Sequence, residues 1–156
     1  MTPRQIVSYT TLAVCLISPW EGLWLTARPD MLARGLPTVC YGMTSYDRPV
    51  RIGDTYTERE CEQFLTNDVP KYYEQIEPCI HVKLSEHEKA ALTSLAYNVG
   101  APTVCKSQAI KQFNSGQHER GCRAIANFTR ANGKVIKGLV NRRRDEVRIC
   151  LTKDAS

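Results

Sequence analysis

Apolar residues follow two different periods along the 156-residue chain. From about residue 23 to 56 they alternate with polar residues in short runs, as at Leu23, Leu25 and Ala27, a spacing typical of half-buried strands. From about residue 57 onward they recur every three or four residues, which indicates helices. We therefore expect a small antiparallel sheet that is stable only because helices pack on it.

Turn residues divide the strand-like part into three runs. The first run ends at Pro29-Asp30, the second covers Thr38–Tyr41, and the third covers Val50–Ile52 before a turn at Gly53-Asp54. The spacing predicts a strand for each run.

Two capping boxes mark helix starts, one with Thr57 and Glu60 and the other with Ser85 and Glu88. Pro70 is expected to end or kink the first of these helices. The predicted helices cover residues 57–69, 85–99 with a stop at Gly100, 103–114, 118–128 and 141–151, with a turn at Asn132-Gly133.

The segment from Ile6 to Ser18 contains an entirely apolar run, Leu12–Ile17, and precedes Glu21. It is shorter than the roughly 20 residues that span a bilayer, and no A-x-A cleavage site follows it. We expect a buried first helix whose end presents Glu21. An export signal or an uncleaved membrane-associating segment is the alternative.

The composition indicates the compartment in which the protein acts more clearly than it indicates the binding partner. The net charge of +5, from 21 Lys and Arg against 16 Asp and Glu, suits an anionic wall, membrane or nucleic acid without choosing among them.

The seven cysteines form no C-x-x-C pair and the three histidines are scattered, so no zinc site is expected. Spread-out cysteines favour disulfides made in an oxidising compartment, with the pairing open and one thiol left over if three bonds form. The alternative is that several are small buried hydrophobes.

Two carboxylates stand out as candidate chemistry. Glu21 lies between Trp20 and Trp24, where desolvation would raise its pKa and keep a proton available for a leaving sugar oxygen. Asp30 lies in a turn, where hydration would keep it ionised. A glycosidase requires one carboxyl group that is protonated and one that is ionised. The two tryptophans are expected to pack in the core.

Residues around this pair resemble the active-site motif of the phage-type lysozymes, or endolysins. The family pattern is E-G-x-x-L, then D, then T-[IV]-G/C-[YWH]-G-H-T, and this chain has Glu21-Gly-Leu, Asp30 and Thr38-Val-Cys-Tyr-Gly-Met-Thr44. Further blocks follow in the same order. They are 53–61, Leu95–Gly100, 107–116 and Gly138–Glu146, the last close to G-L-V-x-R-R-x-x-E.

The resemblance implies catalytic roles for three residues. Glu21 would be the general acid, and Asp30 would act on the opposite face of the sugar by positioning water or stabilising positive charge. Thr38 would help to hold that water or the Asp30 carboxylate. The family places its threonine six residues after the aspartate, whereas here the gap is eight, and Met43 replaces the usual histidine. A two-residue insertion between residues 31 and 36 explains the longer gap.

Substrate contacts are implied on the helical side. Tyr97 and Asn98 would line the cleft, and Arg142 matches an arginine that reaches the catalytic glutamate in the family. The run Arg142–Arg144 could also suggest a nucleic-acid patch, but Asp145 and Glu146 follow at once. We expect a solvated helix face with one inward arginine.

The predicted protein is therefore an α+β, lysozyme-like single domain over residues 1–156. Its β-lobe covers about 23–56, and its helical lobe covers about 57–156 plus the N-terminal helix, with the active-site cleft between them. We expect a monomeric muramidase that cleaves the β-1,4 N-acetylmuramic acid–N-acetylglucosamine bond of peptidoglycan in the periplasm and causes host-cell lysis. It would need no metal or cofactor, bind no nucleic acid and associate weakly with anionic wall or membrane surfaces. The alternatives are a chitinase-like glycosidase and a non-catalytic cationic wall-binding module.

Overall fold

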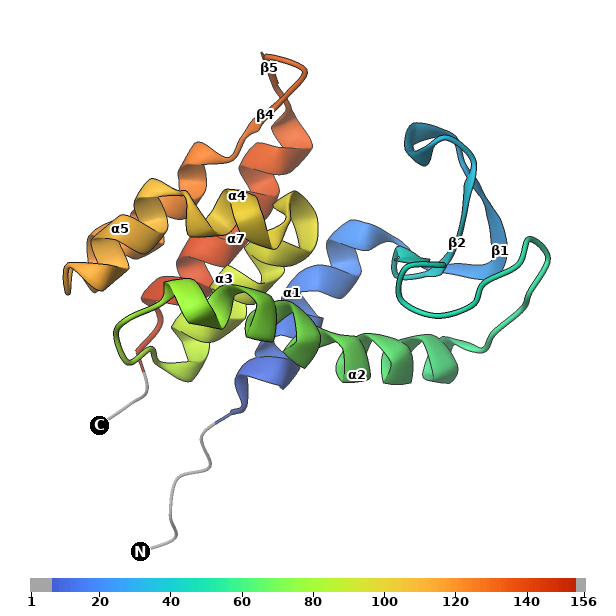
Figure 1. Ribbon diagram of the computed structural model, residues 1–156, viewed down its shortest axis with the longest axis horizontal. Coiled ribbons are helices and arrows are strands. Elements are labelled where there is room, and N and C mark those ends of the chain that lie inside the picture. The colour runs from blue at the N-terminus through green and yellow to red at the C-terminus, as the bar shows by residue number, and fades with distance from the viewer. Residues whose placement is uncertain (1–6, 154–156) are drawn as a thin grey trace, which may run out of the picture. The chain divides into compact units, whose positions relative to one another are not determined.

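The computed structural model describes residues 7–153, which divide into two compact units. The β unit comprises residues 17–68, and the helical unit comprises residues 7–16 and 69–153. Helix α1 (Tyr9–Glu21) and helix α2 (Glu58–Ile76) each run from one unit into the other (Figure 1). The α+β fold class predicted from the sequence is confirmed.

The β unit contains an antiparallel sheet in the order β1-β2-β3. Its strands are β1 (Trp24–Asp30), β2 (Leu36–Cys40) and β3 (Met43–Thr44), with the 3₁₀ turn η1 (Met31–Ala33) between β1 and β2. The predicted strand at Val50–Ile52 is wrong. A turn occupies that position because the Asp54 carboxylate accepts a hydrogen bond from the backbone of Arg51 at 2.8 Å.

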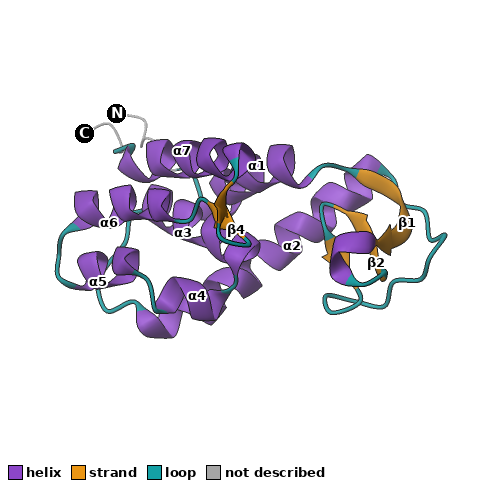
Figure 2. Cartoon of the chain, turned by 90° about the horizontal axis from the view of Figure 1, so that it is seen from above, coloured by secondary structure: helices purple, strands orange, loops and turns teal. Residues whose placement is uncertain are grey.

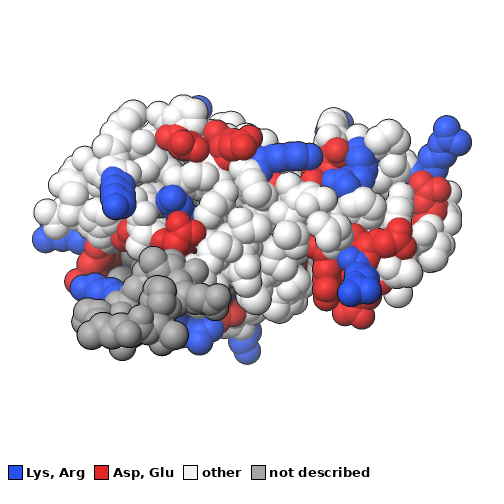
Figure 3. Space-filling model, turned by 90° about the horizontal axis from the view of Figure 1, so that it is seen from below, with Lys and Arg blue, Asp and Glu red and all other residues white. Residues whose placement is uncertain are grey.

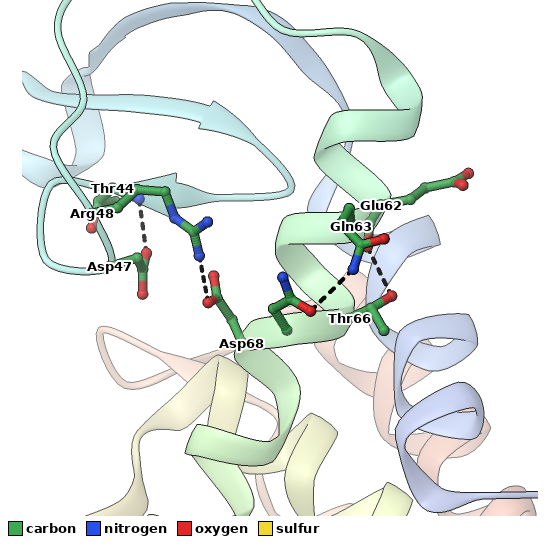
Figure 4. A network of polar contacts seen from close by, with 8 residues as sticks. Thr44, Asp47, Arg48, Glu62, Gln63, Thr66 and Asp68 are labelled. Atoms are coloured by element: carbon green, nitrogen blue, oxygen red, sulfur yellow. Dashed lines mark hydrogen bonds and ion pairs between the residues drawn. The ribbon is translucent and has the colours of Figure 1, made fainter.

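Arg48 ties the loop after β3 to helix α2 inside the β unit (Figure 4). Its Nη2 lies 2.5 Å from Oδ1 of Asp68, and its guanidinium lies 4.2 Å from the centre of the Phe64 ring. The backbone N–H of Thr44 donates to Asp47, which closes the turn that presents Arg48. A small sheet thus gains a polar connection to α2 in addition to its apolar core.

The helical unit is built around α3 (Glu86–Val99), which begins at the predicted capping box and ends at Gly100. Figure 2 shows α3 in the middle of the helices that cover it. The other elements are η2 (Glu77–Cys79), α4 (Ala101–Cys105), α5 (Gln108–Asn114), α6 (His118–Ala124), η3 (Ile125–Asn127), β4 (Arg130–Ala131), β5 (Lys134–Val135) and α7 (Lys137–Leu151).

Several predicted boundaries shift. Helix α2 continues through Pro70, the predicted 103–114 helix is divided into α4 and α5, and α7 begins four residues before the predicted start. Asn132 and Gly133 do form the expected turn, with φ of 51° and 77° between β4 and β5.

The N-terminal prediction of a helix that presents Glu21 agrees with α1, whose buried residues are Ala13, Leu16 and Ile17. Ile6 lies outside the described residues. Within residues 7–153, no helix is both long enough and apolar enough to cross a membrane.

Six cysteines pair in three disulfides, which confirms the expectation of disulfide bonds. Each bond closes within a single unit: Cys40–Cys61 in the β unit, and Cys79–Cys105 and Cys122–Cys150 in the helical unit. Cys15 carries a free, exposed thiol.

Candidate active site

Glu21 is the last residue of α1 and is half-buried. The helix ends there because Gly22 takes a φ of 71°, a left-handed conformation that glycine adopts without steric cost. The tryptophans on either side are not core residues, which corrects the prediction. Trp20 is 36% exposed, and half-buried Trp24 carries the Arg28 guanidinium 3.2 Å above its ring.

Asp30 ends β1 and caps the turn that follows. Its Oδ1 accepts a hydrogen bond from the backbone N–H of Leu32 at 2.9 Å, and its carbonyl accepts one from Gly35 at 2.8 Å. Arg34 and Gly35 both adopt positive φ, which brings the chain back into β2. The segment in which the sequence predicts a two-residue insertion thus forms a short 3₁₀ turn closed by two left-handed residues.

Thr38 lies in β2 and is 6% exposed. It is paired with Arg28 on one side and Thr44 on the other, whereas Asp30 is paired with Leu36. The Thr38 hydroxyl donates to the carbonyl of Leu36 at 3.1 Å. The hydroxyl oxygen can still accept a hydrogen bond from water through its lone pairs.

Glu21, Asp30 and Thr38, the three residues that the sequence proposed as catalytic, all lie in the β unit. Glu21 precedes β1 and Asp30 ends it, while Thr38 lies on the adjacent strand. The backbone hydrogen bond fixes the Asp30 carboxylate through Oδ1, and Oδ2 has no partner among residues 7–153. A half-buried acid and an oriented carboxylate are the two groups that glycoside hydrolysis uses.

Tyr97 and Asn98 lie in the last turn of α3, in the helical unit. The Tyr97 ring packs against that of Tyr72, with centres 4.7 Å apart and planes at 51°. Asn98 is exposed, and its Oδ1 accepts a hydrogen bond from Nη2 of Arg143 at 2.8 Å. The amide of Asn98 is thus oriented by a neighbour that sequence reasoning did not identify.

Arg142 belongs to a buried charge cluster, which we define as Ser94, Arg142, Arg143 and Glu146. Arg143 Nε lies 2.6 Å from Oε1 of Glu146, Arg142 Nε lies 3.8 Å from Oε2, and the Ser94 hydroxyl donates to Oε2 at 2.5 Å. Burial raises the pKa of Glu146, against the opposing effects of Arg143, the Ser94 hydrogen bond and Arg142.

The prediction of a solvated helix face with one inward arginine is wrong. Arg142 and Arg143 are 5% and 1% exposed, and Glu146 is 1% exposed. The spacing of Arg143, Glu146 and Cys150, by three and then four residues, places these two charges in line with an apolar position of the helix. That spacing was the sequence signal for a buried pair.

Metal ligation has no structural basis in the described part of the chain. Among residues 7–153, no group of three or more His, Cys, Asp or Glu side chains is arranged to hold a metal ion.

Comparison with known proteins shows which family the chain resembles. The phage lysozyme family profile matches residues 18–146. A SAR-endolysin of Pseudomonas phage phiKMV is 39% identical over 135 residues, covering 84% of this chain and 81% of the relative. A SAR-endolysin of Enterobacteria phage P21 is 40% identical over 117 residues, covering 75% and 70%. The solved endolysin from Escherichia coli O157:H7 phage FAHEc1 superposes with a TM-score of 0.78 at 31% identity, covering 95% of this chain and 96% of that one.

Proposed function

The chain belongs to the phage lysozyme family and is a glycoside hydrolase, and on this basis we propose that Glu21, Asp30 and Thr38 carry out its muramidase reaction. Glu21 donates a proton to the glycosidic oxygen as the bond to the sugar breaks. Asp30, as a carboxylate, holds the attacking water on the opposite face and takes up its proton. The products are two shorter peptidoglycan strands, one with a new reducing end.

The hydrogen bonds around Asp30 and Thr38 are the observation that supports these roles. The Leu32 N–H fixes Oδ1 of Asp30 at 2.9 Å, so the carboxylate is oriented before water or substrate arrives. The Thr38 hydroxyl uses its proton on the Leu36 carbonyl, so its oxygen acts as an acceptor toward a water O–H. Two acceptors held by one hairpin suit the orientation of a single water molecule.

In this proposal the helical unit binds the substrate. Asn98 presents its amide N–H₂ to sugar acetamido or hydroxyl oxygens, because Arg143 occupies the Oδ1 side. Tyr97 offers its aromatic ring, which packs against the ring of Tyr72, to the sugar. Arg142, which the sequence predicts as a substrate-binding residue, is 5% exposed and lies 3.8 Å from Glu146, so this proposal gives it no substrate contact.

We propose that the enzyme acts in the periplasm, after export from the host cytoplasm, and thereby lyses the host cell. Its relatives in phages phiKMV and P21 are named SAR-endolysins, and SAR-endolysins are exported to the periplasm. The three disulfides support an oxidising compartment. Fractionation of cells that express the whole chain tests this point, and recovery of the protein only from the cytoplasm would contradict it.

A Glu21→Gln variant tests the assignment of the acid. It keeps the side-chain volume but has no proton to donate, so release of reducing ends from purified peptidoglycan should fall by roughly 100-fold or more. Glu62→Gln is the matched control, because Glu62 is an exposed carboxylate of α2 in the same unit. Circular dichroism establishes that both variants fold.

Equal activity of the Glu21→Gln variant and the wild type would overturn the assignment. Reducing ends released from chitin but not from peptidoglycan would support the chitinase-like alternative. Wall binding without any release of reducing ends would support the non-catalytic module.

A further inference from the structure

The β4–β5 hairpin is the most exposed segment of the helical unit. All nine residues from 130 to 138 are exposed, and the two strands pair only with each other (Figure 1). Asn132 and Gly133 form its two-residue turn with positive φ at both positions, the geometry that suits a tight hairpin. The backbone N–H of Ile136 also donates to the carbonyl of Thr129 at 2.9 Å, which closes the base of the hairpin.

Positive charge is concentrated around this hairpin. Between Glu119 and Asp145 there is no acidic residue, but eight of the 21 lysines and arginines fall in this stretch. The rest of the chain therefore carries 13 basic against 16 acidic residues, so this stretch accounts for the entire positive surplus. On the face drawn in Figure 3, by contrast, acidic and basic side chains are interspersed.

Six of these eight cations are exposed, since only Arg142 and Arg143 are buried. Arg123 forms an ion pair with Glu119. In the described part of the chain, no carboxylate forms an ion pair with Arg130, Lys134 or Lys137. The hairpin therefore presents positive charge that no acidic group of the described chain neutralises.

Two apolar side chains lie among these cations. Val135 is 56% exposed and Ile136 is 41% exposed, and Lys134 and Lys137 flank them directly. Lys137 also opens α7, which has no acidic residue in its first turn. A cation at a helix N-terminus opposes the helix dipole and disfavours the fold, so this placement is not explained by stability.

We propose that the β4–β5 hairpin, residues 130–137, docks the enzyme on an anionic phospholipid membrane. The lysines and Arg130 would contact lipid phosphates, while Val135 and Ile136 would enter the boundary between headgroups and acyl chains. Positive charge alone would bind an anionic polymer equally well. The adjacent exposed apolar pair favours a surface with an apolar interior.

Vesicle co-sedimentation of the full chain tests this proposal. Vesicles of phosphatidylcholine with one quarter phosphatidylglycerol should bind the protein, and vesicles of phosphatidylcholine alone should bind it far less. The double variant Lys134→Gln/Lys137→Gln should bind the anionic vesicles roughly 30-fold more weakly at low salt, since each lysine near such a surface contributes about fivefold. Raising the salt concentration should reduce this difference.

The matched control is Lys83→Gln/Lys111→Gln, which removes the same charge from exposed positions elsewhere in the helical unit. It should bind nearly as well as the wild type. Val135→Ser/Ile136→Ser should weaken binding several-fold at both low and high salt, because it removes only the apolar contribution. All variants should retain wild-type hydrolysis of purified, membrane-free peptidoglycan.

Three results would overturn the proposal. One is equal loss of binding in the hairpin and control lysine variants, which would reflect net charge alone. Another is no preference for anionic vesicles. The third is loss of binding to purified peptidoglycan in the hairpin variants with vesicle binding unchanged, which would make the hairpin a wall-binding element.

Discussion

Removal of the Glu146 side chain tests how much the buried charge cluster contributes to stability. In a Glu146→Ala variant the Arg143 guanidinium, 1% exposed, loses a carboxylate that lies 2.6 Å from its Nε. The Ser94 hydroxyl loses its acceptor at the same time. Breaking a buried ion pair from one side costs about 3–5 kcal/mol, because the remaining charge stays out of water. A domain with a total stability of about 5–15 kcal/mol would lose a large part of it.

Urea unfolding followed by circular dichroism measures this loss as a lower midpoint at an unchanged slope. Glu119→Ala is the matched control, because Glu119 forms an exposed i,i+4 ion pair with Arg123 in α6. That change should cost less than about 1 kcal/mol. If both variants lose the same free energy of unfolding, the buried cluster does not stabilise the fold in the way described here.

The same carboxyl group gives a pH dependence with a definite sign. Burial raises the pKa of Glu146 above its ordinary value of 4.5, so the folded state holds this proton more tightly than the unfolded chain does. The contribution of Glu146 to stability therefore falls as pH rises from the unfolded pKa through the raised one. Relative to Glu146→Gln, the wild type should lose free energy of unfolding over this window. A wild type that gains stability over the variant there would show the opposite shift.

Three further changes have definite expected outcomes. Replacing both Cys122 and Cys150 by serine, which opens a loop of 28-residue separation, should lower the free energy of unfolding by about 3.6 kcal/mol in urea titrations. Gly121→Ala should lower the melting temperature and cost about 1–3 kcal/mol, because the added Cβ would lie 2.6 Å from the Phe113 ring. Thr38→Val should lower kcat on peptidoglycan by roughly 100-fold through a misplaced water, whereas Thr38→Ser should retain most of it. Equal kcat values for these two Thr38 variants would contradict the role given to the hydroxyl.

Local hydrogen-bonding rules explain why the helix starts were predictable. At Ser85 and Glu88 each side chain accepts a hydrogen bond from the other's backbone N–H, at 3.1 and 2.9 Å. Thr57 and Glu60 form the same reciprocal pair at 3.1 Å each. Both patterns depend on residues three positions apart, so no tertiary information was needed to recognise them.

The charges on α7 were misjudged because their burial depends on contacts far away in the sequence. The partner of Glu146 in α3 is Ser94, 52 residues earlier, and Asn98 orients Arg143 from 45 residues earlier. Hydropathy assigns an Arg-Arg-Arg run to solvent, since it scores each residue without its partner. The predicted strand at Val50–Ile52 failed for a different reason, because the turn formed by Arg51 and Asp54 overrides a short apolar alternation.

The gap between Asp30 and Thr38 shows what a residue count can and cannot establish. Counting revealed two residues more than the family pattern and placed them between residues 31 and 36, but it did not predict the conformation of that segment. The structure uses Arg34 and Gly35, with φ of 57° and 79°, to return from a 3₁₀ turn that Asp30 itself caps. The same Asp30 side chain stabilises the turn and, in our proposal, holds the attacking water. The backbone N–H of Leu32 in this turn fixes the Asp30 carboxylate, so a change that disrupts the turn should impair catalysis before it impairs folding.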